Sequence, residues 1–380
     1  MEKPYTRARA SVGVEFSIVC SSCGRRYKAS ARLWRCECGS PLDIEKRLEG
    51  EVELKGWGVW RYRSLIPHVG GDIVTLGEGW TPTVEREVWG VRALLKLEYL
   101  HPTGSFKDRG ATVMVSNLKA LGADRVLIDS SGNAGVAVAA YCAAAGIGCR
   151  VYVPSSAPPA KKLQIKLYGA ELVEVEGPRS EVARRALEEV ERGAVYASHM
   201  WNPFFIEGLK TIAFECCEQA GTPDAVVAPV GSGGLLLGIY WGFGEAAQIG
   251  LAQGVPRAIA VQAEGYTPLY DALHGPYGAA PPPEPFADGI AIPNPPRLKQ
   301  LVKVVKESKG EVVVVSEEET REALRYALRM GFFVEPTSAT AIAALRKARE
   351  EGLIDSGERV LIPLTGSGLK ALDKIARRML

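Results

Sequence analysis

From residue 91 onward the sequence alternates between short apolar runs typical of strands and longer Ala- and Leu-rich stretches with helical periodicity. This alternation predicts an α/β architecture with largely parallel sheets, because a parallel neighbour is reached through a crossover helix. Several runs end in Gly- and Ser-rich turns, at the edge where such sheets bind ligands. The predicted strands are 93–97, 126–129, 149–153, 171–175, 225–229, 258–262, 311–315 and 360–363, and the predicted helices include 134–145, 180–192, 320–330 and one from Ala111.

The size and charge of the chain narrow the possible classes of protein. Its 380 residues are enough for two domains or more. A formal net charge of +2 gives no reason to expect nucleic acid or a membrane as a partner. The longest apolar stretch, 136–149, is too short to span a bilayer, and residues 1–17 lack the apolar core of a signal peptide. We therefore expect a cytoplasmic protein that acts on a small molecule, with a Pro-rich surface loop at 275–285.

The eight cysteines fall into two groups. The first group forms two tight knuckles near the N-terminus and consists of Cys20, Cys23, Cys36 and Cys38. Four thiolates can bind zinc tetrahedrally, although the second pair has one intervening residue where zinc ribbons usually have two. A small cap with four reduced thiols is the alternative. The second group lies in apolar surroundings and is expected to consist of core thiols: Cys142, Cys149, Cys216 and Cys217.

One segment, Pro-Thr-Gly-Ser-Phe-Lys-Asp-Arg-Gly at 102–110, places a lysine in a tight turn between a predicted strand and a predicted helix. A lysine reacts as a covalent amine only if its ammonium loses its proton easily, which burial near a cation can arrange. Lys107 is therefore the candidate catalytic residue. The alternative is an ordinary solvated charge run, which a Lys-Asp-Arg triplet usually is.

Three turns follow predicted strands and open helices. Ser-Ser-Gly-Asn-Ala at 130–134 offers unpaired N–H groups and a helix dipole to a carboxylate or phosphate. Gly-Ser-Gly-Gly-Leu at 231–235 lets the backbone wrap an anion, and it matches neither a dinucleotide fingerprint nor a nucleotide P-loop. In the third turn, the Thr365 hydroxyl could hydrogen-bond a ring nitrogen. Each could instead be a plain capped helix start.

A reactive lysine, a phosphate-binding turn, the amide of Asn133 and the hydroxyl of Thr365 together meet the needs of pyridoxal 5'-phosphate. Their order resembles that of the fold-type II pyridoxal-phosphate enzymes (the tryptophan synthase β-subunit family) over nearly the whole chain, and most of all that of the threonine synthases. The segments that carry the resemblance are 75–82, 102–110 and Glu-Pro-Thr-Ser-Ala at 335–339.

The resemblance implies two three-layer αβα domains behind a zinc-ribbon-like segment at 1–50. The large cofactor-binding domain would comprise residues 51–112 and 205–380, and a small mobile domain would comprise residues 113–204. The resemblance also implies a homodimer, and closure of the small domain over the cofactor.

The resemblance also assigns roles to individual residues. Lys107 would bond the cofactor covalently, Asn133 would contact its 3-hydroxyl and Thr365 would face its ring nitrogen. The cofactor phosphate would lie on Gly231, Ser232, Gly233, Gly234 and Leu235. The candidates for substrate binding are Ser105, Ser131, Gly132, Ala134 and Arg297, with Lys161 and Lys162 as further candidates for a substrate phosphate. For the three cations, solvated surface charge is the alternative.

The implied activity is that of a threonine synthase, which converts O-phospho-L-homoserine and water to L-threonine and phosphate. The sequence departs from the family pattern at Ala134, where threonine is usual, at Ser367, where histidine is common, and at His101, where asparagine is common. A cysteine or cysteate synthase using O-phosphoserine and a serine/threonine ammonia-lyase therefore stay open. A non-catalytic regulatory relative is an alternative of another class, although it would be expected to have lost the lysine or the phosphate turn.

Overall fold

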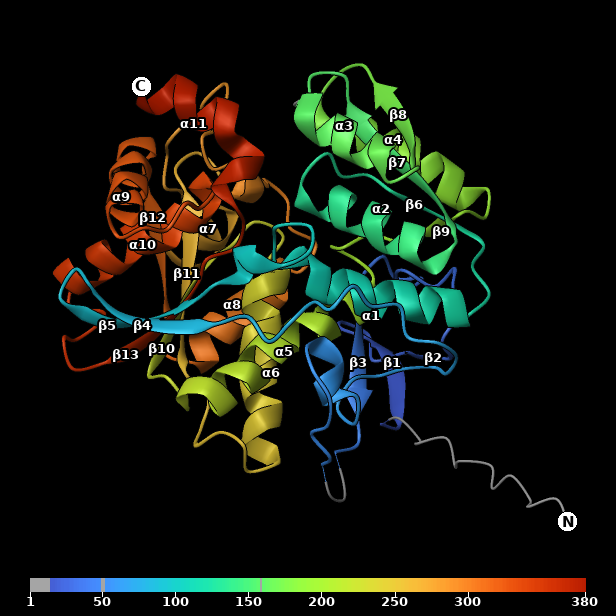
Figure 1. Ribbon diagram of the computed structural model, residues 1–380, viewed down its shortest axis with the longest axis horizontal. Coiled ribbons are helices and arrows are strands. Elements are labelled where there is room, and N and C mark those ends of the chain that lie inside the picture. The colour runs from blue at the N-terminus through green and yellow to red at the C-terminus, as the bar shows by residue number, and fades with distance from the viewer. Residues whose placement is uncertain (1–13, 49–51, 158) are drawn as a thin grey trace, which may run out of the picture.

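The computed structural model describes residues 14–48, 52–157 and 159–380 (Figure 1). These residues form three sheets. A three-stranded sheet lies near the N-terminus. A six-stranded sheet is built from strands that come before and after the strands of a four-stranded sheet in the chain.

The six-stranded sheet has the order β12-β11-β10-β13-β5-β4 and is parallel except at β4. Both of its faces are buried, because Leu94 and Val226 point into one core while Leu95 and Val227 point into the other. Its strands are β4 (Thr83–Val88), β5 (Val91–Lys96), β10 (Ala225–Pro229), β11 (Arg257–Ala263), β12 (Glu311–Val315) and β13 (Arg359–Pro363).

Helices cover both faces of this sheet, which makes it a three-layer αβα unit (Figure 1). The face of Leu94 is covered by α5 (Pro203–Ala220), α6 (Gly234–Gln248), α7 (Pro268–His274) and α8 (Leu298–Glu307). The face of Leu95 is covered by α9 (Glu317–Arg329), α10 (Pro336–Glu350) and α11 (Leu372–Met379). Short 3₁₀ turns occur at Val59–Tyr62, Glu98–Leu100, Asp288–Ile290 and Gly368–Ala371.

The four-stranded sheet is a second, smaller αβα unit. Its parallel strands are β6 (Arg125–Ile128), β7 (Gly148–Pro154), β8 (Glu171–Val175) and β9 (Val195–Tyr196), in the order β8-β7-β6-β9. One face is covered by α2 (Asn133–Ala145) and α3 (Pro159–Leu167), and the other by α4 (Arg179–Glu191). Helix α1 (Lys107–Ala120) joins the two units, because it packs on α2 and also on α5.

The N-terminal sheet is an antiparallel ribbon of β1 (Phe16–Cys20), β2 (Arg26–Tyr27) and β3 (Leu42–Lys46), with β1 in the centre. Strand β3 packs against α5, so the ribbon is attached to the larger αβα unit on the side away from α9 and α10 (Figure 1).

The predicted strands match the structure to within two residues at either end, and the 275–285 segment is free of helix and strand. The helix expected from Ala111 begins four residues earlier, at Lys107. The reason is local, since the Asp108 carboxylate accepts a hydrogen bond from the Thr103 N–H at 2.8 Å and ties the first helical turn to the preceding loop. Strand β4 was not predicted, because its polar centre lacks the apolar signal of the other strands. In the described ranges, no helix is both long and apolar enough to cross a membrane.

Candidate active site

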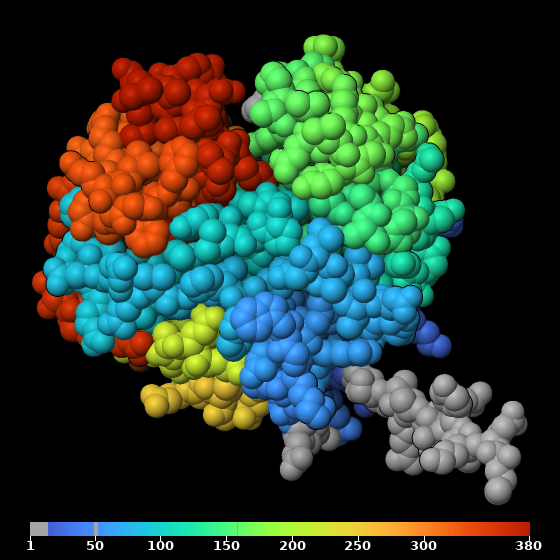
Figure 2. Space-filling model, in the orientation of Figure 1, coloured from blue at the N-terminus to red at the C-terminus, as the bar shows by residue number. Residues whose placement is uncertain are grey.

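A cavity of about 230 Å³ lies between the two αβα units, at the carboxyl ends of β6, β10 and β13. Its wall includes the start of α1, the turn after β6, the turn after β10 and Thr365 after β13. Figure 2 shows a notch in the surface between the C-terminal residues, in red, and residues of the smaller unit, in green. The three Gly- and Ser-rich turns singled out in the sequence therefore converge on one site.

Lys107 is half-buried in the wall of this cavity, and its Nζ lies 3.9 Å from the centre of the Phe106 ring. Burial lowers the pKa of this lysine to about 8, helped by the charge of Arg179 and opposed by that of Glu335. A neutral amine is therefore available much closer to neutral pH than on a solvated lysine.

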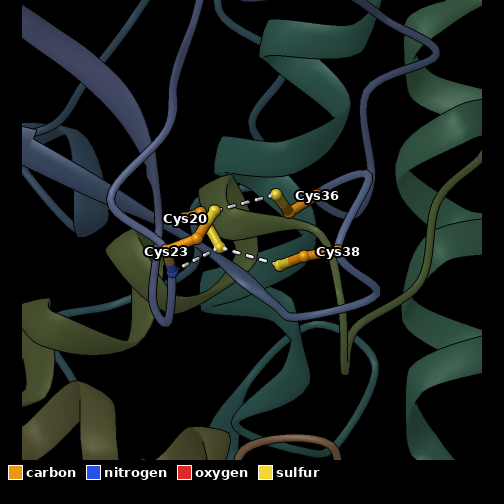
Figure 3. Close-up of side chains that lie close together, drawn as sticks. All are labelled: Cys20, Cys23, Cys36 and Cys38. Carbon is orange, nitrogen blue, oxygen red and sulfur yellow. Dashed lines mark hydrogen bonds between the residues drawn. The ribbon is translucent and has the colours of Figure 1, made fainter.

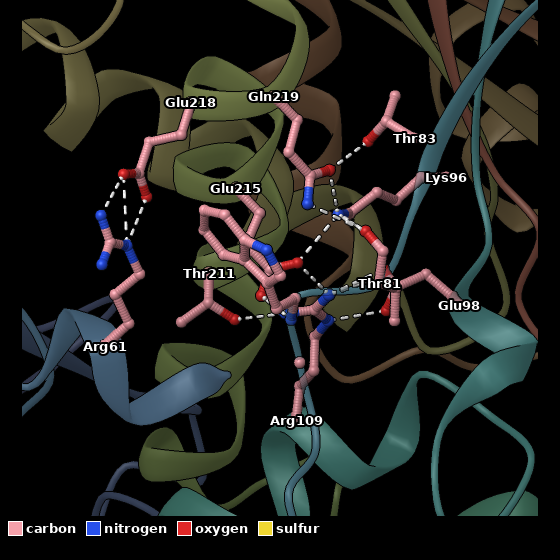
Figure 4. Close-up of polar contacts among 12 residues, drawn as sticks. Arg61, Thr81, Thr83, Lys96, Glu98, Arg109, Thr211, Glu215, Glu218 and Gln219 are labelled. Atoms are coloured by element: carbon pink, nitrogen blue, oxygen red, sulfur yellow. Dashed lines mark hydrogen bonds and ion pairs between the residues drawn. The ribbon is translucent and has the colours of Figure 1, made fainter. Parts of the chain in front are cut away.

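The position of Lys107 is fixed by Arg109, which lies two residues later and is fully buried (Figure 4). The Arg109 guanidinium binds Glu98 at 2.7 Å and Glu215 of α5 at 2.5 Å, and Lys96 of β5 binds the same Glu215 at 2.8 Å. Burial alone would raise the pKa of Glu215, but the charges of Arg109 and Lys96 hold it at about 2. This cluster ties the first turn of α1 to the larger unit.

The turn at 130–134 lines the cavity and ends in the first residues of α2. The next residue must be glycine, because a Cβ on Gly135 would lie 1.9 Å from the Ser130 carbonyl oxygen. Asn133 Nδ2 donates a hydrogen bond to Glu335 at 2.9 Å, which leaves its Oδ1 buried and without a partner among the described residues. Such an unpaired oxygen is costly unless a ligand meets it.

The turn at 231–235 forms a narrow cradle. Gly233 has a φ of +87°, and a Cβ there would lie 2.5 Å from Leu301 Cδ1. A Cβ on Gly231 would lie 2.9 Å from the Gly289 carbonyl oxygen. The backbone N–H groups at the start of α6 can therefore approach an anion that side chains would otherwise keep away.

Thr365 belongs to a buried hydroxyl–carboxylate group. Its Oγ1 donates to Glu335 Oε1 at 3.0 Å and lies 2.9 Å from Ser338 Oγ. Because Glu335 also accepts from Asn133, one carboxylate links the residues predicted for the two sides of the cofactor ring. Glu335 lines the cavity and was recognised in the sequence only as part of the 335–339 segment.

Sequence reasoning missed two further residues of the cavity wall. Arg179, the first residue of α4, comes from the smaller unit. His199 lies in the connection to α5, and its Nδ1 is buried with no partner in the part of the chain that the structure describes. Burial lowers the pKa of His199 well below its ordinary value, reinforced by the charges of Lys107 and Arg179. Neither residue lies in a motif, so only the fold could bring them here.

Three of the expected substrate residues, Ser131, Gly132 and Ala134, line the cavity. Ser105 lies directly before the wall residue Phe106, and its buried Oγ meets no partner within the described ranges. Within the 231–235 turn, every residue except Gly234 is in the cavity wall. Among the two lysine candidates, Lys161 is in the wall, whereas Lys162 instead binds Glu174 at 2.6 Å.

Arg297 is not where the sequence analysis expected it. Its guanidinium is buried outside this cavity, where it binds Asp43 Oδ1 at 2.6 Å and the Leu42 carbonyl at 2.7 Å. An arginine tied in this way holds the N-terminal ribbon to α8, and the placement of Arg297 in the substrate site is therefore corrected. The long separation of Arg297 and Asp43 in the chain hides this pair from sequence reasoning.

The four N-terminal cysteines come together, with all four Sγ atoms within 4.8 Å of one another (Figure 3). The Sγ atoms of Cys20 and Cys38 are 3.5 Å apart, and those of Cys23 and Cys36 are 3.6 Å apart. Ligands of a tetrahedral zinc–thiolate site lie roughly 3.8 Å from one another, given Zn–S bonds of about 2.3 Å. The donor set fits zinc despite the short second knuckle.

In the second group of cysteines, burial raises the pKa of the Cys216 thiol to about 12, as expected for a core thiol.

The family model described as "Pyridoxal-phosphate dependent enzyme" matches residues 74–366, most of the chain and all of the cavity wall. The chain belongs to this family. Its cofactor is therefore pyridoxal phosphate, and the residues present fit it. The Lys107 amine, the cradle at 231–235 and the unpaired oxygen of Asn133 face one cavity.

Similar proteins include two named threonine synthases. That of Methanocaldococcus jannaschii is 36% identical, and the match covers 94% of each chain. That of Mycobacterium tuberculosis is 38% identical, over 84% of this chain and 89% of the relative.

Among solved structures, the serine racemase from Dictyostelium discoideum is 27% identical with a TM-score of 0.64, covering 76% of this chain and 92% of that one. Threonine deaminase isoform 2 from Solanum lycopersicum, at 24% identity and a TM-score of 0.66, covers 78% of this chain and 82% of its own, and it shows the shared fold. The architecture is that of the fold-type II enzymes.

Proposed function

We propose that this protein is a threonine synthase, a lyase that converts O-phospho-L-homoserine and water to L-threonine and phosphate. The observation that carries the proposal is that one cavity holds more anion-binding groups than the cofactor needs. Besides the cradle at 231–235 and the turn at 130–134, Lys161 and Arg179 line the wall. Free serine or threonine would bring no phosphate to these two cations, of which Lys161 has, among the described residues, only the Asp288 carboxylate at 3.6 Å as an ion-pair partner. The relatives named threonine synthase support the same activity.

The substrate would lie with its carboxylate on the N–H groups of the 130–134 turn, at the N-terminus of α2. Its phosphate would then reach toward Lys161 and Arg179, which come from α3 and α4 of the smaller unit. Lys161 Nζ is 3.6 Å from Asp288 of the larger unit, so the phosphate would enter beside an existing contact between the two units.

Lys107 would carry out the proton transfers. Bound pyridoxal phosphate supplies an electron sink for negative charge at the substrate's Cα. The Nζ of Lys107 would take the Cα proton, because it lies in the cavity wall and its pKa of about 8 suits a general base near neutral pH. The Thr365 hydroxyl would turn its proton from Glu335 to the ring nitrogen when the cofactor binds, and a neutral partner there would temper the sink and favour chemistry beyond Cα.

We also propose that the protein is a homodimer and that residues 113–204 act as a mobile domain that closes over the substrate. In support of a moving unit, two of the cations in the cavity wall lie in the smaller unit, while the cradle lies in the larger one. In the structure, α1 runs without interruption through the expected boundary at 112/113. Light scattering measures the oligomeric state.

The test is a side-by-side incubation of the holoenzyme with O-phospho-L-homoserine, O-phospho-L-serine plus sulfide, L-serine and L-threonine. Phosphate release and amino-acid products are measured together. We expect equal amounts of threonine and phosphate from the first substrate. Cysteine formed from O-phosphoserine, or ammonia released from serine or threonine, with no threonine from the first substrate, would contradict the proposal.

A further inference from the structure

Trp34 links the cysteine cluster to the smaller αβα unit. It lies two residues before Cys36, in the loop between the two cysteine pairs. Its indole packs edge-on against Tyr196 at 5.2 Å and against Trp201 at 5.3 Å between ring centres. Trp34 thereby joins the apolar cluster on the α4 face of the four-stranded sheet. A side chain of the N-terminal segment thus completes the core of a unit far along the chain.

Tyr196 carries this contact onward to the substrate turn. The residue is 2% exposed, and its hydroxyl donates a hydrogen bond of 2.6 Å to Asp129 Oδ1. Asp129 is itself 3% exposed and lies between strand β6 and Ser130, the first residue of the turn that lines the cavity. A buried carboxylate that loses its donor is costly, so this bond constrains where the turn begins.

The connection from β9 to α5 runs beneath the same tryptophan. The Ala197 N–H donates to the Leu127 carbonyl of β6 at 2.8 Å, and the Trp201 N–H donates to the Ser198 carbonyl at 3.3 Å. His199, between them, lines the cavity. Trp34 therefore rests directly on the β9–α5 segment, which carries His199, and reaches the segment after β6 through the Tyr196 hydroxyl.

The ribbon that carries Trp34 is anchored on the larger unit. Phe16 packs edge-on against Phe204 of α5 at 5.9 Å. Lys46 binds Glu207 of α5 at 2.8 Å, with both side chains buried. The N-terminal segment thus touches both αβα units, and the cysteine cluster fixes the loop that reaches across.

From these contacts we infer that Trp34 and Tyr196 are positioning residues for the substrate turn. The cysteine cluster fixes the loop of Trp34, Trp34 holds Tyr196 in place, and the Tyr196 hydroxyl holds Asp129 and the 130–134 turn. A metal ion bound by the four thiols would stiffen this loop. The inference concerns positioning of the turn and does not depend on which amino acid the enzyme uses.

Amide hydrogen exchange of the full-length holoenzyme tests the inference without any substrate. We expect Trp34→Ala and Tyr196→Phe each to speed exchange at 129–134 by about tenfold or more, since each removes support from a buried charged hydrogen bond. Exchange at the cofactor cradle, 231–235, should stay unchanged. Trp34→Phe should retain most of the protection, because it keeps an aromatic edge against Tyr196.

Trp57→Ala is the matched control, because Trp57 is 66% exposed and contacts Trp80. It should leave exchange at 129–134 as in the wild type. Cys23→Ser, which removes one ligand, should lower bound zinc in elemental analysis and speed exchange at 129–134.

Exchange at 129–134 that stays at the wild-type rate in both Trp34→Ala and Tyr196→Phe would overturn the inference. A uniform rise across the whole chain in both variants would also overturn it, because it would show a purely global role. A wild-type protein that contains no metal would show that no metal ion helps to fix the loop of Trp34. Where turnover is measurable, a higher KM with little change in kcat in Trp34→Ala and Tyr196→Phe would support a positioning role. This second readout rests on the proposed function.

Discussion

Two groups of charged and polar side chains lie close together in this molecule and differ in one respect. In the cluster around Arg109, every charge has a buried partner: Arg109 binds Glu98 and Glu215, and Lys96 binds Glu215 and the Thr81 carbonyl (Figure 4). In the cavity wall next to it, Asn133 Oδ1 and His199 Nδ1 are buried and unpartnered by any residue that the structure describes.

The difference separates structural charge from functional charge. A buried polar group without a partner lowers stability, and it persists where a ligand supplies the missing contact. Arg109 and Lys107 stand two residues apart in one helix, yet the first is saturated by protein groups, and the second finds no hydrogen-bond acceptor for its proton in the described ranges. In this pair of neighbouring groups, the atoms left without a partner among the described residues are therefore those that face the cavity.

The largest expected effect is that of Lys107→Ala. Removing the amine should abolish the visible absorbance of covalently bound cofactor and lower turnover by at least about 10³-fold, since both bonding and proton transfer are lost. Absorbance spectra and product formation are the measurements, with circular dichroism to confirm folding. Turnover near the wild-type rate would contradict the role of Lys107.

We expect Arg109→Met to lower the free energy of unfolding, although Arg109 is not itself a residue of the cavity wall. The substitution leaves Glu98 and Glu215 buried without their main counter-charge, which costs about 3–5 kcal/mol of unfolding free energy. Urea denaturation measures it. The control is Arg184→Met, because within the described residues Arg184 forms only surface ion pairs, with Glu181 and Glu188, and its loss should cost about 0–1 kcal/mol. Equal losses of unfolding free energy in the two variants would show that the charges buried around Arg109 stabilise the fold no more than surface ion pairs do.

Gly233→Ala should weaken cofactor binding. A φ of +87° and the nearby Leu301 side chain force the cradle to move, at a strain of about 1–3 kcal/mol, so the Kd for pyridoxal phosphate should rise by roughly tenfold or more. Fluorescence titration measures the Kd. Gly244→Ala, in helix α6, which begins directly after Gly233, has open space around it and should bind the cofactor as the wild type does. An unchanged Kd in Gly233→Ala would show that the cradle at 231–235 does not bind the cofactor.

Arg179→Gln should raise the KM for O-phospho-L-homoserine by about tenfold, because a hydrogen bond to a charged phosphate contributes about 1.5–3 kcal/mol. Cofactor binding should be unaffected. Arg184→Gln on the same helix is the matched control. An unchanged KM in Arg179→Gln would show that the substrate phosphate binds to other residues of the cavity wall.

The last prediction concerns the pH dependence of cofactor capture. Burial lowers the pKa of Lys107 to about 8, so its neutral form is scarce below pH 8 and dominant above it. The rate at which cofactor-free protein captures pyridoxal phosphate should rise about tenfold per pH unit up to pH 8 and then level off. A rate that keeps rising to pH 10 would show an ordinary, solvated lysine.

Much of the fold could be predicted, because strand and helix periodicity is local. The lysine segment and the three turns were also readable, since each has a fixed residue order. Arg179 and His199 could not be found, because nothing near them in the sequence marks them as lining a cavity. Arg297 was misplaced for a related reason, since its partner Asp43 lies in the ribbon at the other end of the chain. The meeting of the four cysteines could be predicted from their spacing, whereas the contact of Trp34 with Tyr196 depends on tertiary packing alone.

The most direct test of the central claim is to add pyridoxal phosphate to cofactor-free protein, reduce the complex with borohydride and locate the label by peptide mass spectrometry. We expect one equivalent of cofactor per chain, fixed to Lys107. A label on any other lysine, or a protein that takes up no cofactor, would contradict the assignment of this cavity as the active site.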